Sequence, residues 1–272
     1  MKKVVGRVTF STLLILSGFV GFGQQWHLEN EISLHQATDL DVSINRNIFV
    51  GNKKGEVIKF DSQGKNSLIY SPSKTGAIEN LEAWSPFKTL VFYNAFQEAV
   101  ILNRFLAELA RYDLQDFDLG FISLLSLNFE QNFWVVDESD FSLKLIDKST
   151  KRVIVHQPFN QFLDINNHEI VFLREYQNKL YVVDREFGIL IFDNLGNLLD
   201  NIEVLGIQGM GFDDDSYFYH IGSELYIKSL YMAEESALIL PKSDFQFVYK
   251  SGEYIYCLAP NQLLIYRYLS GE

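Results

Sequence analysis

The sequence predicts an all-β protein, a six-bladed β-propeller whose blades are four-stranded antiparallel sheets. Short apolar runs rich in Val, Ile, Phe and Tyr alternate with turns rich in Asn, Asp, Gly and Ser, which is typical of strands joined by tight turns. A strand–turn–strand element also recurs with a period of about 40 residues, the length of one propeller blade. A two-layer sandwich or an open β-solenoid could use the same strands, but a sandwich does not normally show this internal period.

The recurring hairpin appears six times along the chain. Its first strand ends at Asn52, Asn94, Asp137, Asp184 and, in two weaker copies, Ile221 and Leu258. Two more strand-like runs flank each hairpin, clearest at 39–44 before the first copy and 67–71 after it. Four strands in each of six repeats therefore predict six blades.

One segment has a composition that conflicts with this register. Residues 98–114 are rich in helix formers and have apolar residues at helical spacing. In register with the other copies, the same residues form two strands joined by a turn at 106–108. We expect the strands, because the repeat is a stronger signal than local propensity.

The two ends of the predicted domain are expected to meet in the last blade. The final repeat supplies three strands before the chain ends, and Trp26–Leu34 is available as a fourth. Pairing of this N-terminal strand with Leu263–Tyr268 would close the ring and cover an edge that is otherwise open.

The N-terminus has the features of a signal peptide. Lys2, Lys3 and Arg7 precede an uncharged run at 8–22, and Gly21 and Gly23 suit a signal peptidase. We therefore expect a signal peptide at 1–23, a single propeller domain at 24–272, and a periplasmic or extracellular location. The rival interpretation is an uncleaved anchor over 8–26, which Ser, Thr and Gly residues make a poor membrane span.

The net charge limits the kinds of partner, and the cysteine count limits disulfide and zinc chemistry. The chain has 35 acidic and 23 basic side chains and a net charge of −12, which disfavours nucleic acid and anionic lipid. The single cysteine, Cys257, excludes an intramolecular disulfide and a cysteine-based zinc site. We expect a monomer with no stable membrane span after signal cleavage, whose partner is a protein or another envelope component.

One repeat carries a family resemblance. The segment LYVVDREFGILIFDNLGN at 180–197 resembles an NHL-type repeat, although it lacks the usual Asn and Arg in the turn. The whole mature chain is similar to uncharacterised secreted bacterial six-bladed β-propeller proteins. The resemblance implies this fold and export, and it brings no catalytic residues with it.

Motifs for catalysis or metal binding do not emerge. The sequence has no nucleophile elbow, no phosphate-binding loop and no dinucleotide fingerprint after a strand. Calcium would suit an acidic exported protein, but neither 164–169 nor 213–215 has the ligand spacing of a calcium loop. The five histidines are scattered without metal-ligand spacing. We therefore predict no cofactor and no metal.

If the protein has a site, the hairpin turns are the candidate location, because loops of one propeller face gather around the channel. The candidates are Asp137, Asp140, Asp184, Arg185 and Lys54. Arg185 and Lys54 could pair with a carboxylate or phosphate of a partner. In the competing interpretation, the aspartates only cap their turns and Arg185 is solvated.

These observations favour a non-enzymatic binding module of the cell envelope. The alternative is a propeller-type hydrolase or lyase that acts on a glycan or a small ester in the periplasm. Such enzymes place a metal or a histidine–carboxylate set in the channel, and neither spacing is present in the sequence. Because a fold does not determine a function, both alternatives stay open here.

Overall fold

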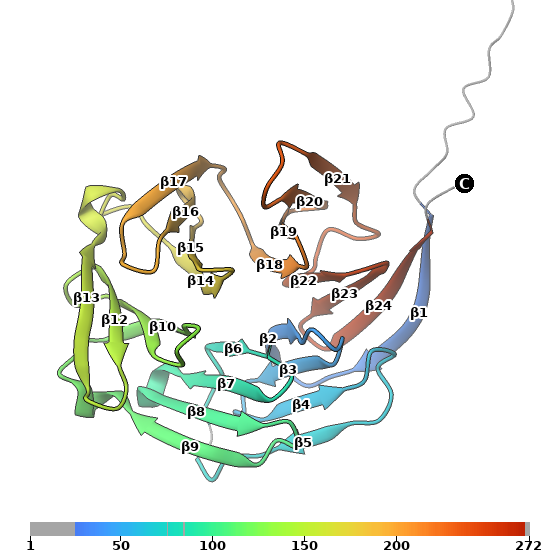
Figure 1. Ribbon diagram of the computed structural model, residues 1–272. Coiled ribbons are helices and arrows are strands. Elements are labelled where there is room, and N and C mark those ends of the chain that lie inside the picture. The colour runs from blue at the N-terminus through green and yellow to red at the C-terminus, as the bar shows by residue number, and fades with distance from the viewer. Residues whose placement is uncertain (1–24, 75, 84, 270–272) are drawn as a thin grey trace, which may run out of the picture.

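A computed structural model describes residues 25–74, 76–83 and 85–269 of the chain. The predicted signal peptide at 1–23 lies outside the described residues. In the described part, six four-stranded antiparallel sheets are arranged around a central channel (Figure 1). This is the predicted six-bladed β-propeller.

Each of the first five blades is one continuous stretch of chain. Blade 1 comprises β2 (Ala37–Val42), β3 (Ile48–Asn52), β4 (Val57–Phe60) and β5 (Leu68–Tyr70), and blade 2 comprises β6 (Asn80–Glu82), β7 (Lys88–Tyr93), β8 (Glu98–Asn103) and β9 (Glu108–Asp113). Blade 3 comprises β10 (Ile122–Leu127), β11 (Phe133–Asp137), β12 (Ser142–Asp147) and β13 (Arg152–Pro158). Blade 4 comprises β14 (Ile170–Tyr176), β15 (Lys179–Asp184), β16 (Gly188–Phe192) and β17 (Leu198–Glu203), and blade 5 comprises β18 (Gly209–Asp213), β19 (Ser216–Ile221), β20 (Glu224–Ser229) and β21 (Glu235–Ile239).

Blade 6 joins the two ends of the described chain. It comprises β22 (Phe247–Ser251), β23 (Tyr254–Ala259), β24 (Gln262–Leu269) and, as its outer strand, β1 (Gln25–Ser33). The antiparallel register runs from Gln25↔Leu269 to Ser33↔Gln262, with a bulge between Leu28 and Asn30. The predicted closure by the N-terminal strand is therefore confirmed.

Short 3-10 turns connect some of these strands. They are η1 (Asn94–Phe96), η2 (Leu114–Phe117) and η3 (Phe159–Gln161). The stretch with helical composition forms β8 and β9, as the repeat register predicts. The turn between them lies at 104–107 and not at the predicted 106–108, because β9 already begins at Glu108. Leu106 in this turn has a positive φ of 62° and is buried.

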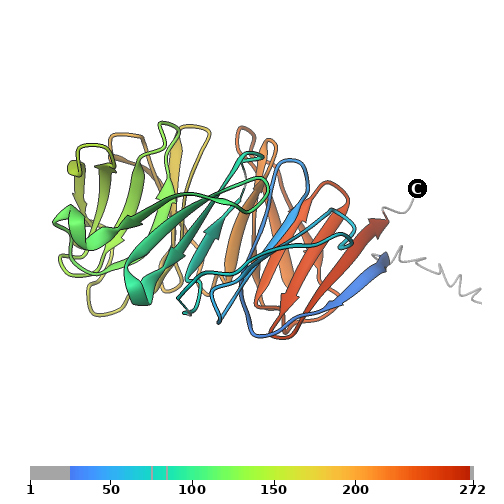
Figure 2. The ribbon, with the colours of Figure 1, turned by 90° about the horizontal axis from the view of Figure 1, so that it is seen from below.

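The two ends of the channel differ in which connections they carry, as the edge-on view shows (Figure 2). In each blade, the strands are counted outward from the channel. One end of the channel carries the turns between the first and second strands and between the third and fourth strands, and we call this end the funnel face. We call the hairpin face the end with the turns between second and third strands and the connections between blades. The repeat hairpin turns of the sequence therefore belong to the hairpin face.

The blades pack against one another through buried aromatic and branched side chains. Trp134 and Phe133 are fully buried on opposite sides of β11, in the packing clusters toward blade 4 and blade 2. Large rings fill the widening gap between neighbouring sheets, which stabilises the ring as a whole. Among the described residues, no helix has the length and apolarity needed to cross a membrane.

Candidate functional site

An ion pair between Asp41 and Arg174 lies at the boundary between two cavities of the central channel. Asp41 is on β2 of blade 1, and Arg174 is on β14 of blade 4, on the opposite side of the ring. The Arg174 Nη1 and Nη2 atoms donate to the two Asp41 carboxylate oxygens over 3.1 and 3.0 Å. Both side chains are buried, and Arg174 lines both cavities.

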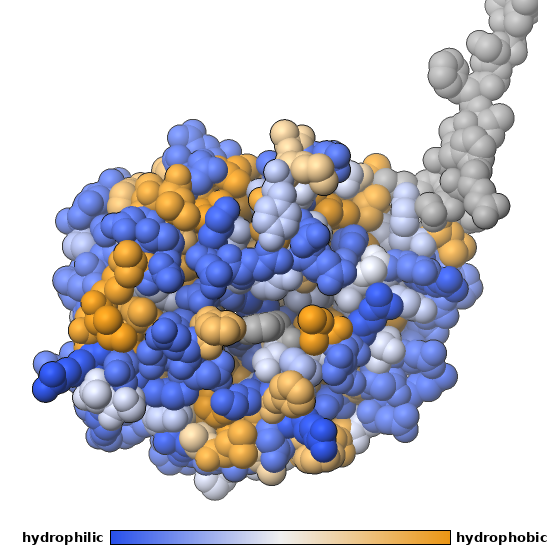
Figure 3. All heavy atoms as spheres, viewed as in Figure 1, coloured by the Kyte–Doolittle hydropathy of each residue, from blue (hydrophilic) through white to orange (hydrophobic). Residues whose placement is uncertain are grey.

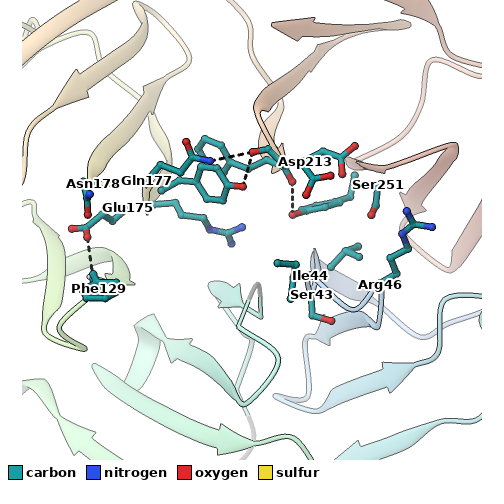
Figure 4. Close-up of a pocket in the computed structure, with 15 residues that line it drawn as sticks. Ser43, Ile44, Arg46, Phe129, Glu175, Gln177, Asn178, Asp213 and Ser251 are labelled. Carbon is teal, nitrogen blue, oxygen red and sulfur yellow. Dashed lines mark hydrogen bonds between the residues drawn. The ribbon is translucent and has the colours of Figure 1, made fainter. Parts of the chain in front are cut away.

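The first cavity, the funnel, opens on the funnel face and has a volume of about 570 Å³. Figure 4 shows its side chains converging on the channel from blades 1, 3, 4, 5 and 6. Its lining includes Ile44, Phe129, Arg174, Glu175, Tyr176, Phe212, Asp213 and Tyr249. Apolar walls with a few oriented polar groups are typical of a binding pocket.

The Nε donor of the Arg174 guanidinium is unused. This nitrogen is buried and has no hydrogen-bond partner in the described structure. Burial lowers the pKa of Arg174, but the Asp41 and Glu82 carboxylates outweigh burial and hold that pKa above its ordinary value. A permanently charged group with a free N–H between the two cavities can donate to an acceptor atom of a ligand or a water.

Carboxylates of the inner strands also link neighbouring blades. Asp39 and Asp41 accept from the backbone N–H groups of Leu81 and Ala83 in blade 2, each over 2.6 Å. The channel edge of an inner strand has no strand partner, so side chains must satisfy its N–H groups. Burial raises the pKa of Asp39 to about 7, against the opposing hydrogen bonds from Leu81 and Leu40.

Glu175 fixes one wall of the funnel. Its carboxylate accepts from the Phe129 backbone N–H over 3.0 Å and from the Trp134 ring N–H over 2.7 Å. Both donors belong to blade 3, whereas Glu175 is on β14 of blade 4. The two bonds hold the turn that carries Phe129 at the mouth of the funnel.

The opposite wall is made by stacked rings and a second ion pair. The rings of Tyr176 and Phe212 stack at 4.3 Å, and the Tyr176 hydroxyl donates to the Asp214 carbonyl over 2.8 Å. Asp213 accepts from Lys250 Nζ over 2.6 Å. These contacts join blades 4, 5 and 6, and the Asp213 carboxylate of this wall is already paired.

More exposed hydrophobic side chains lie on the funnel face than on the hairpin face, and others lie on the outer strands of the blades. Ile44 is 69% exposed and Phe129 is 79% exposed, both at the funnel mouth. The same face also exposes Phe87, Phe105, Leu195, Tyr231 and Met232, whereas the hairpin face exposes Phe121, Ile165 and Leu205. In Figure 3, hydrophobic residues lie around the centre of the ring among hydrophilic ones. Exposed apolar side chains that lie close together favour contact with a partner.

The structure brings two of the predicted candidates together on the hairpin face. Asp137 and Asp140 both contact Lys144 Nζ over 2.7 Å. Asp137 is fully buried and also accepts from the backbone N–H groups of Gly120 and Ser139. Its carboxylate therefore holds the turn and the approaching interblade loop.

The other candidates occupy different positions. Asp184 is buried and accepts from the backbone N–H groups of Glu186 and Glu169. Arg185 pairs with the Glu169 carboxylate and lines the second channel cavity, of about 510 Å³, on the hairpin face. Lys54 is exposed in the blade 1 turn and is not among the residues that line either channel cavity.

No group of three His, Cys, Asp or Glu side chains in the described part of the chain is arranged to hold a metal ion. Cys257 is buried, and burial raises its pKa well above the ordinary value, so its sulfur is held as an unreactive thiol. What the described arrangement offers is an apolar mouth, a buried guanidinium and paired carboxylates, which suits binding.

Sequence reasoning did not find the funnel. The signal was available as polar residues of first strands: Asp39 and Asp41 in blade 1, Asn80 and Glu82 in blade 2, and Arg174 with Glu175 after an apolar run in blade 4. A sequence shows that such residues recur, but it does not show that Asp41 and Arg174 meet across a ring.

Comparisons with known proteins support the fold. No protein-family model matches the chain, and no curated protein matches its sequence. Among solved structures, it is similar to the β-propeller domain of Cps50 (Swd1) from Myceliophteria thermophila, with 12% identity and a TM-score of 0.63 over 89% of this chain and 99% of that chain.

Two further structures have the same level of similarity. Virginiamycin B lyase from Staphylococcus aureus is 10% identical with a TM-score of 0.61, covering 90% of this chain and all of that chain (100%). The Pan2 WD40 domain from Neurospora crassa is 7% identical with a TM-score of 0.62, covering 92% of this chain and 97% of that chain. At such low identity these likenesses show a β-propeller fold, and any function must be argued from the chain's own residues.

Proposed function

We propose that this protein is a non-enzymatic interaction module of the cell envelope, and that it binds a protein partner through its funnel face. The observation that carries the proposal is the funnel itself. Exposed Ile44 and Phe129 surround the entrance of a cavity whose inner end carries the buried Arg174 guanidinium. A preformed cavity with apolar residues at its entrance and a polar group at its inner end commonly binds one anchoring side chain of a partner.

Export is part of this proposal and is supported by sequence alone. The basic leader, the uncharged run and the small residues at 21 and 23 are the features of a signal peptide. Mass spectrometry of the native N-terminus tests this. We expect a chain that begins near Gln24, and a chain that retains Lys2 would contradict export with cleavage.

The enzymatic alternative has less support from the channel geometry. The structural similarity to a lyase is a similarity of fold. A general base needs a carboxylate that is free to take a proton. In the funnel, Glu175 already accepts two hydrogen bonds and Asp213 is paired with Lys250. In the second cavity, Asp39 has a raised pKa but accepts from the backbone N–H groups of Leu40 and Leu81. Stoichiometric calcium or zinc in the purified protein would reverse this preference.

Two double variants that introduce carboxylates test whether the partner binds through the funnel face. Ile44→Asp with Phe129→Asp places two carboxylates at the funnel mouth. The control is Phe121→Asp with Ile165→Asp, two exposed apolar residues of the hairpin face. Both variants and the wild type are compared in capture from an envelope extract, with the captured protein identified by mass spectrometry.

We expect the funnel-face variant to retain less than about a tenth of the partner that the wild type captures, because a buried apolar anchor contributes about 1.4 kcal/mol or more. The control variant should capture as much as the wild type. Equal capture by all three proteins, with unchanged thermal unfolding, would contradict the proposed face.

A further inference from the structure

The funnel face carries a row of basic side chains in an otherwise acidic protein. We call Lys59, Lys88, Arg104 and Lys148 the basic arc. They lie in blades 1, 2 and 3, at the funnel-face ends of their strands or in the turns that follow. The protein has a net charge of −12, so a local cluster of cations needs a specific explanation.

The four cations are neighbours along the arc. Lys59 Nζ donates to the Arg104 carbonyl over 2.8 Å. Lys88 is paired in the β7–β8 register with Asn103, the residue before Arg104. Lys88 Nζ in turn donates to Gln131 in the blade 3 turn over 3.1 Å. The arc therefore runs continuously from blade 1 to blade 3.

These cations are held together at an energetic cost. Burial and the nearby Arg104 lower the pKa of Lys59, and burial and the nearby Lys88 lower the pKa of Lys148. No ion pair joins any of the four to a carboxylate of the described residues. Asp147, beside Lys148 in sequence, instead accepts from Ser149 and Thr150 in its own turn.

Aromatic rings lie under and between the cations. Lys59 Nζ is 5.4 Å from the Phe49 ring centroid, and the Arg104 guanidinium is 4.6 Å from that of Phe105. Phe105 is 64% exposed and Phe87, next to Lys88, is 67% exposed. The arc thus combines partly buried positive charge with exposed apolar surface, which favours an occupant that has both carboxylates and apolar side chains.

We propose that the basic arc binds an acidic segment of the partner protein, in which carboxylates alternate with apolar side chains. The carboxylates supply the counter-charge that the arc lacks, and the apolar side chains cover Phe87 and Phe105. This inference rests on the proposed function, because Phe129 at the funnel mouth lies in the same blade 3 turn as Gln131.

A narrow protein segment fits this face better than an anionic membrane or a nucleic acid. The same face also carries Glu130 and the acidic run at 213–215. A broad anionic surface pressed against the face would meet these carboxylates as well as the arc, with a repulsive contribution. A segment that follows blades 1 to 3 passes Glu130 but avoids the acidic turn of blade 5, whereas a broad surface would meet both.

The test uses a synthetic peptide of alternating Glu and Leu as the probe and the chain from Gln25 onward as the protein. The arc variant is Lys88→Gln with Lys148→Gln. Its matched control is Lys53→Gln with Lys242→Gln, two exposed lysines of the hairpin face, which changes the net charge equally. A rescue variant, Lys88→Arg with Lys148→Arg, keeps the charge. Titration calorimetry measures the Kd, and thermal unfolding verifies that each variant is folded.

We expect wild-type binding that weakens with added salt, an arc variant about tenfold weaker, and a control and a rescue variant within about twofold of the wild type. Failure of the wild type to bind the peptide at low salt would overturn the inference, as would equal weakening by the control. Stronger binding to phosphatidylglycerol vesicles or to a single-stranded oligonucleotide than to the peptide would also overturn it.

The outcomes separate this inference from the proposed function. The arc variant is also used in envelope capture beside the Ile44→Asp, Phe129→Asp variant. If the arc variant captures the partner as the wild type does while the funnel-face variant does not, the acidic-segment inference fails and the proposed function stands. If neither variant loses the partner, both fail.

Discussion

At the scale of single residues, the channel depends on one buried ion pair between opposite blades. Arg174 contributes two donors to Asp41, and Asp41 also accepts from the Ala83 backbone N–H. The sequence shows Arg174 as an isolated cation in an apolar strand and Asp41 as an inner-strand aspartate. Their pairing could not be predicted, because it depends on the diameter of the closed ring and on the direction of one long side chain.

The structure also specifies what the hairpin-face candidates do. Asp137 and Asp184 hold turns and interblade loops with backbone hydrogen bonds, which matches the turn-capping interpretation weighed from sequence. Arg185 is the candidate that reaches a channel cavity. A role for any of the five residues in binding stays a prediction.

Removal of one partner of the central ion pair should destabilise the protein strongly. Arg174→Met leaves the Asp41 carboxylate buried without a counter-charge, and we expect a loss of about 3–5 kcal/mol in the free energy of unfolding. The double variant Arg174→Met with Asp41→Asn should lose less than the sum of the two single variants, because no uncompensated charge remains. Urea unfolding of the four proteins measures this coupling. If the losses in the free energy of unfolding of the two single variants simply add in the double variant, the Asp41–Arg174 pair contributes no coupling energy across the channel.

At the scale of elements, the repeat hairpin was the most predictable feature. It has the same strand–turn–strand plan in every blade, so the copies reinforce one another in the sequence. Residues 98–114 form β8 and β9 despite helical propensity, because β7 and the packing of neighbouring blades determine the conformation there. The outer strand β5 of blade 1 and the inner strand β6 of blade 2 have only three residues each, and a sequence pattern alone does not give their bounds.

Removal of the N-terminal strand should weaken the whole ring. β1 covers β24 along its full length, and Trp26 and Ile32 pack against the cluster that joins blades 1, 5 and 6. A chain that begins at Leu34 should therefore melt about 10 °C or more below a chain that begins at Gln25. Calorimetry compares the two chains, and equal melting temperatures would contradict closure by β1.

At the scale of the whole molecule, the two faces of the ring differ in character. The hairpin face carries turns whose carboxylates are occupied by backbone donors and lysines. The funnel face carries the exposed Ile44 and Phe129, the basic arc and the cavity whose inner end is lined by Arg174. The sequence predicted the ring but placed the candidate site on the hairpin face, because the hairpin turns are the conspicuous repeat and the funnel is assembled from residues that do not repeat.

Site-specific photo-crosslinking in intact cells tests whether a partner binds the funnel face. A photoreactive amino acid takes the place of Phe129 on the funnel face or, as the control, of Leu205 on the hairpin face. Both side chains are well exposed, by 79% and 66%, so access to the reactive group is similar. We predict a discrete crosslinked product to one protein from position 129, and none from position 205. A product from position 205 alone, or the same product from both positions, would contradict binding through the funnel face.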